Sequence, residues 1–244
     1  RIMAPLEWAT LIVCCAALLL RVPDAVRGRN RTVFGILFLG TLCSVLAVSE
    51  LYKVIDGVLG GRQLASLILR YLVFAAVLLV GLRVTRGLAA GGAHHLIAGG
   101  IGRWVLALCC VAVAVTFVLM GTYASPDGLP APARDAAAAS YFTAAGRTYP
   151  AFVSLVLMAP LLAAVRGRLP RLVRAGALLV LLGAFFAVMS FPASFAPDGW
   201  AGAQHFINYS AALGYVVGLA VFWFSGLISG SSGNAKATLS RYHG

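Results

Sequence analysis

The feature that most constrains this chain is a series of apolar stretches, each about 20 residues long, separated by short polar connections. A helix of about 20 apolar residues crosses a hydrocarbon core of roughly 30 Å. Each stretch is apolar around most of its circumference, as a lipid-embedded helix requires. The sequence therefore predicts an all-α, polytopic membrane protein that forms a seven-transmembrane-helix bundle.

The predicted spans cover residues about 5–22, 32–53, 64–82, 104–123, 141–165, 175–196 and 203–228. They make up a transmembrane domain over 1–228, and we expect 229–244 to be a flexible cytoplasmic tail because it is polar and rich in small residues. The first stretch is too long for a signal peptide and lacks a small-residue cleavage pattern, so we interpret it as a span. Only 11% of the residues are charged, against roughly 25% in soluble domains.

The net charge of +12 is distributed unevenly along the chain. Alternate connections carry most of the arginines: Arg21, Arg27, Arg29, Arg31, Arg83, Arg86, Arg103, Arg166, Arg168, Arg171 and Arg174. Because cytoplasmic connections are enriched in Lys and Arg, this pattern places the N-terminus outside and the C-terminus in the cytoplasm of a plasma membrane. We expect these loops to contact anionic lipid headgroups rather than nucleic acid.

The stretch ELYKVIDGVLGGRQLASLILRYLVF, residues 50–74, concentrates charge in an otherwise apolar chain. Arg70 lies six residues inside a predicted helix, at a depth of about 9 Å. An ionisable group at that depth is costly unless it is paired or hydrated, so it is a functional candidate. Glu50 lies near the same membrane face, and we expect it to pair with Arg70. The alternatives are a purely structural ion pair and an arginine that extends to the headgroups.

Further polar residues begin the predicted fifth and seventh helices at the same level. Together they predict an outward-facing vestibule for a small or lipid-like ligand, whose candidate residues are Glu50, Asp56, Arg70, Arg147, Tyr149, His205 and Asn208. The alternative is the ordinary polarity of helix ends at the membrane interface.

Catalytic signatures are missing from the sequence. There is no H-E-x-x-H, nucleophile elbow or Walker loop, and neither Lys53 nor Lys236 is placed to bind retinal. The five cysteines lie in apolar stretches and are expected to pack there. His94 and His95 occur in a glycine-rich connection that we expect to be flexible. We expect no catalytic residue, metal or cofactor, and no enzymatic activity.

Small residues recur every four positions in the seventh stretch, at Ser210, Gly214 and Gly218. Such a stripe lets two membrane helices approach closely. It predicts helix packing, either within the bundle or against another subunit in a homo- or hetero-oligomer.

Two stretches resemble a group of actinobacterial seven-helix integral membrane proteins that are described as transporters. They are ALLLRVPDAVRGRNR after the first span, and YKVIDGVLGGRQLASLILRYLVF across the second connection. The stretch VLMGTYASPDGLPAPARDAAAASYFTAAGRTYPAFVSLVL is similar to the fourth-to-fifth connection of that group. The resemblance implies a seven-helix fold and transport, and it brings no catalytic residues. A seven-helix receptor or sensor, or a non-catalytic accessory subunit of a larger membrane complex, are the alternatives.

Overall fold

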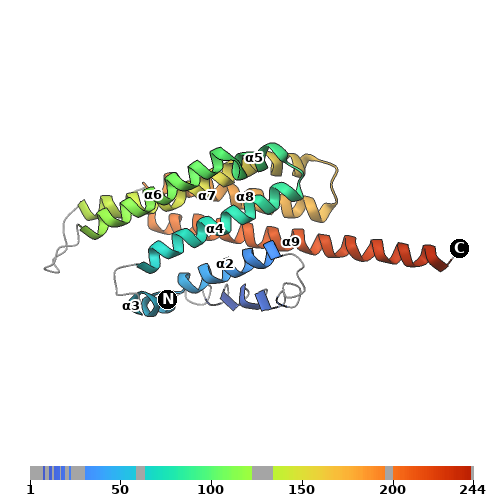
Figure 1. Cartoon of the computed structure of the whole chain (residues 1–244), viewed down its shortest axis with the longest axis horizontal. Helices are drawn as coiled ribbons and strands as arrows, with labels where there is room; N and C mark the ends of the chain where they lie inside the picture. Colours follow the sequence, from blue (N-terminus) through green and yellow to red (C-terminus); the bar gives the residue numbers. More distant parts are fainter. Residues whose placement is uncertain are drawn as a thin grey trace. The chain divides into compact units, whose positions relative to one another are not determined.

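The computed structural model describes residues 31–58, 64–122, 134–195 and 200–242, with isolated positions between 8 and 22. Within these ranges every regular element is a helix (Figure 1). The helices are α2 (Arg31–Ala47), α3 (Ser49–Val58), α4 (Leu64–Gly87), α5 (Gly91–Ala98), α6 (Gly100–Thr122), α7 (Arg134–Arg166), α8 (Arg171–Ala193) and α9 (Ala201–Tyr242).

Several of these helices are long and apolar enough to cross a membrane. The five candidate spans are Leu64–Gly87, Gly100–Leu119, Ala139–Arg166, Arg171–Ala193 and Gly202–Phe222. A bent pair formed by α2 and α3 raises the number to six if it counts as one span. The architecture is that of a helical, multi-pass membrane protein. The predicted first span, 5–22, lies largely outside the described residues, so the number seven and the orientation stay predictions.

The predicted span 32–53 is wrong in its last part. Its helix ends at Ala47, and the segments Phe34–Leu46 and Glu50–Val58 meet at an angle of 92°. From Glu50 onward a charged residue occurs at every third position, and Lys53 is exposed whereas Ile55 is half-buried. Such an amphipathic segment suits the membrane interface better than the hydrocarbon core.

The chain divides into two compact units, Arg1–Val153 and Ser154–Gly244, and the boundary falls within α7. In the first unit α4 packs against α2, α5 and α6. Two long-range bonds show how neighbouring elements are joined. The Tyr71 hydroxyl donates to the Cys110 carbonyl of α6 over 3.1 Å, and the Ser44 hydroxyl donates to the Cys14 sulfur over 3.5 Å. The core of this unit includes Phe74, which is 2% exposed.

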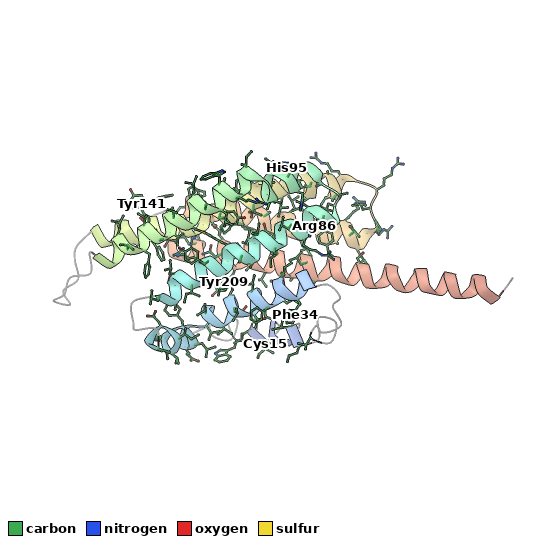
Figure 2. The ribbon with its side chains drawn as sticks, viewed as in Figure 1. Cys15, Phe34, Arg86, His95, Tyr141 and Tyr209 are labelled. Atoms are coloured by element: carbon green, nitrogen blue, oxygen red, sulfur yellow. The ribbon has the colours of Figure 1, made fainter. Side chains whose placement is uncertain are left out.

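The connection between α4 and α6 is not the flexible loop that its glycines predict. It contains helix α5, whose Ile97 is buried at 2% exposure. The Thr85 hydroxyl and His94 Nδ1 form a hydrogen bond of 3.1 Å, and the Ala90 amide donates to the Thr85 carbonyl over 2.9 Å. Figure 2 shows Arg86 and His95 at the same end of the first unit, away from Tyr141 near the start of α7. Burial of Ile97 and two hydrogen bonds thus outweigh the flexibility of the glycines.

In the second unit α8 and α9 pack along their lengths. The contact is close because two glycines face each other: a Cβ on Gly214 would lie 2.6 Å from the Gly183 Cα. The Gln204 side-chain amide donates to the Ala193 carbonyl over 2.7 Å and closes the α8–α9 connection. Helix α9 continues to Tyr242, through most of the segment 229–244 for which the sequence predicted a flexible tail. The cytoplasmic location of this segment stays a prediction.

Candidate functional site

Arg70 is the centre of the candidate site, on the second turn of α4. Its side chain is half-buried and reaches α7, where Nη1 donates to the Thr143 carbonyl over 3.4 Å. The guanidinium carbon lies 3.9 Å from the centroid of the Phe142 ring. A cation on an aromatic face is stabilised by about 0.5–2 kcal/mol, which offsets part of the cost of a charge at this depth.

Gly146 provides the space in which the guanidinium lies. A Cβ at this position would overlap Arg70 Nη1 and would approach the Cδ and Cζ atoms of Arg70 to 2.8 Å. Phe142 and Gly146 are four residues apart, so they share one face of α7. The FTAAG segment, residues 142–146, therefore supplies both a ring and a gap for one arginine of α4.

Two buried polar atoms near this contact have no hydrogen-bond partner within the described ranges: Arg70 Nε and the Tyr149 hydroxyl oxygen. Tyr149 is fully buried, and its ring lies 5.3 Å from that of Phe74, one turn along α4 from Arg70. An unsatisfied buried polar group costs about 1–3 kcal/mol, and more when it is charged. Each of these two groups therefore requires an explanation, such as a bound water, an ion or a ligand. We call Arg70, Phe142, Thr143, Gly146 and Tyr149 the Arg70 cluster.

The charge around the Arg70 cluster is positive. Arg147, the residue after Gly146, is close enough for the two guanidinium groups to repel each other. No Asp or Glu occurs between Asp56 and Asp127, or between Asp135 and Asp198. The helices that form the cluster therefore carry no carboxylate in the membrane-spanning part that could neutralise Arg70.

The expected Glu50–Arg70 ion pair is not formed in the part of the chain that the structure describes. Glu50 is exposed on α3, beyond the 92° bend, while Arg70 is directed to α7. Asp56 has a structural role: its carboxylate accepts a hydrogen bond of 3.2 Å from the Ala65 amide, in the first turn of α4. A carboxylate at this position satisfies a free helix amide and complements the helix dipole.

The remaining predicted residues lie on α9, in the second unit. Asn208 and Ser210 are half-buried, and the side chain of His205 lies outside the described residues. Gly214 and Gly218 face α8, where a Cβ on Gly218 would lie 2.8 Å from the Val180 amide nitrogen. This glycine face is thus occupied by a helix of the same chain. The Ser154 and Tyr215 hydroxyls, 2.7 Å apart, connect α7 to α9 within this unit.

The described cysteines are free thiols, and Cys109 of α6 is buried. Among the described residues, no group of three or more His, Cys, Asp or Glu side chains lies together so as to hold a metal. The absence of a metal or cofactor from the whole chain stays a prediction.

Sequence reasoning identified one of the four α7 residues of the cluster and missed the other three. Arg147 and Tyr149 were candidates, but Phe142, Thr143 and Gly146 were not. A signal was present, because an aromatic residue and a glycine four positions apart form a notch on one helix face. In comparisons with protein-family models, curated proteins and solved structures, no match was found for this chain.

Proposed function

We propose that this chain is a plasma-membrane protein that binds the anionic group of a small or lipid-like ligand at the Arg70 cluster, and that it transports this ligand. The observation that carries the proposal is the buried Arg70 Nε, which has no hydrogen-bond partner within the described ranges and no carboxylate in the surrounding spans. A cation held in this way is electrostatically complementary to a carboxylate or a phosphate ester.

The chemistry of the surroundings supports a ligand with an apolar body. The guanidinium is bordered by aromatic rings, since Phe142 covers it and Phe117 lies 5.8 Å from Phe142. Phe74 and Tyr149 continue the aromatic packing one turn further, and both rings are buried. A ligand with an acyl chain or another apolar body would contact these rings by entering between α4 and α7, and its anionic end would then meet Arg70.

Transport is the preferred activity because of the resemblance to seven-helix proteins described as transporters. In this proposal the N-terminus is outside, the arginine-rich connections are cytoplasmic, and Arg70 lies near the external face. A ligand that binds without crossing the membrane would favour the receptor or sensor alternative.

The test uses the full chain in detergent and four probes with the same twelve-carbon tail: laurate, lauryl phosphate, lauryl maltoside and lauryl trimethylammonium. We expect only the two anionic probes to raise the melting temperature, by the few degrees that about 2–3 kcal/mol of linkage stabilisation produces at saturating ligand. Equal stabilisation by the neutral or cationic probe would refute the proposal.

The variant Arg70→Leu separates function from structure. We expect it to abolish the response to the anions while the ligand-free melting temperature stays unchanged or rises, because a buried charge is replaced by an apolar side chain. Arg168→Leu, at an exposed arginine in the α7–α8 connection, is the control and should respond like the wild type. If Arg70→Leu retains the full response to laurate, the site is elsewhere. Uptake of radiolabelled laurate into proteoliposomes then distinguishes transport from binding alone.

A further inference from the structure

A second group of basic side chains lies at the opposite end of α4. Its exposed members are Arg83 and Arg86 of α4, His95 of α5, and Arg103 of α6. We call these four residues the basic end. Arg70 and Arg86 are 16 residues apart, so about 24 Å of helix separates this end from the Arg70 cluster.

The basic end is held on an ordered frame. The Thr85–His94 hydrogen bond and the buried Ile97 fix α5 between α4 and α6. The Arg103 amide also donates to the Gly99 carbonyl over 3.1 Å at the start of α6. The cations are therefore presented by helices, so less conformational entropy is lost when an anion binds than for a mobile loop.

Two separate shallow depressions lie along one exposed face of α6, and we call this face the α6 groove. Its first part is lined by Gly100, Arg103, Trp104 and Ala107, and a second part by Ala114, Val115, Val118 and Leu119. These positions recur with the helical period, so both parts lie on one face of α6. Trp104 is 73% exposed, and Leu108 further along is 64% exposed. The groove thus has Arg103 and the Trp104 indole at one end, and apolar side chains along the rest of its length.

We propose that this groove binds an anionic phospholipid, with the phosphate at Arg103 and one acyl chain along α6. An acyl chain of one leaflet covers about 15 Å, half of the hydrocarbon core, which corresponds to about ten residues of α6. The chain would then lie over Ala107 and end near Ala114, while Trp104 sits at headgroup level. Arg83 and Arg86 supply additional attraction, since no carboxylate lies on α4, α5 or α6 to compete.

The experiment measures lipid retention on the full chain. The purified protein in detergent is mixed with equal amounts of phosphatidylglycerol and phosphatidylcholine, and bound lipid is counted by native mass spectrometry. We expect phosphatidylglycerol to exceed phosphatidylcholine several-fold. Arg103→Gln should lower this ratio about fivefold, the effect of one arginine near the membrane surface. Ala107→Phe, which fills the groove, should reduce retention of the same lipid without changing the charge.

One control keeps the result specific. Arg168→Gln, at an exposed arginine in the α7–α8 connection, should leave the ratio unchanged. Equal retention of both lipids would overturn the inference. So would full competition by millimolar inorganic phosphate, which would show a phosphate site without a chain-binding groove. A dimer of the chain that Ala107→Phe dissociates would assign the groove to protein contact instead.

Discussion

Arg70 and Arg86 belong to the same helix, yet their surroundings are opposite. Arg86 is exposed in the last turn of α4, where a cation complements the negative end of the helix dipole. Arg70 lies against a ring and a glycine of α7, with a buried nitrogen that lacks a partner within the described ranges. Placing a charge at the exposed Arg86 position costs little free energy, whereas placing one at the Arg70 position costs a few kcal/mol. An arginine kept at a costly position is the stronger indication of a ligand.

The largest effect is expected at the notch that admits Arg70. Gly146→Ala adds a methyl group that overlaps the guanidinium and should displace it from Phe142, lowering the free energy of unfolding by about 1–2 kcal/mol. Gly40→Ala is the control, because nothing lies within 4 Å of a Cβ there, and it should stabilise α2 by about 0.5–1 kcal/mol. Chemical unfolding in detergent measures both. If both variants change the free energy of unfolding in the same direction, the position of the Arg70 side chain does not depend on Gly146.

A double-mutant cycle sharpens the comparison at the ring. Arg70→Leu and Phe142→Leu should show a coupling energy of about 1 kcal/mol, because the cation lies 3.9 Å from the ring centroid. The same cycle between Arg86 and Phe142 should give a value near zero. Unfolding free energies of the two single variants and the double variant provide the measurement. Additive effects for the Arg70 pair would mean that the ring only fills space.

At the basic end, a smaller effect is expected from the bond that holds α5. Thr85→Val removes the hydroxyl that lies 3.1 Å from His94 Nδ1 and should cost about 0.5–1.5 kcal/mol. Thr116→Val in α6 is the control, because the Thr116 hydroxyl bonds only carbonyls of its own helix, at 2.7 and 3.1 Å. Hydrogen exchange of residues 88–99 should accelerate in the first variant alone. Unchanged exchange would show that burial of Ile97 suffices to hold α5.

The smallest effect is expected at Arg86 itself. Arg86→Gln should change the free energy of unfolding by less than about 0.5 kcal/mol, as an exposed substitution away from any network does. Thermal unfolding in detergent at two salt concentrations checks this. A loss above about 1 kcal/mol would break the contrast between the two ends of α4, since Arg86 would then also be structurally required.

The positions of the spans followed from hydropathy, but the rotation of each helix did not. Apolar stretches predicted 64–82 and 175–196 well, because length and composition decide them. The same reasoning predicted one continuous span over 32–53, where the structure has a 92° bend. The charged residues from Glu50 onward were a local signal that the apolar span ends there. Which face of α7 meets Arg70 depends on tertiary packing, and hydropathy carries no such information. The place of Arg70 within a helix long enough to span a membrane was therefore predictable, whereas its neighbours Phe142 and Gly146 were not.

The right-angled junction between α2 and α3 also has a mechanical consequence. When α2 runs along the bilayer normal, the ten residues of α3 extend about 15 Å parallel to the membrane surface. Its far end is tied to the first turn of α4 by the Asp56–Ala65 bond of 3.2 Å. The end of α3 and the first turn of α4 are thus held together, in the turn that precedes the one carrying Arg70.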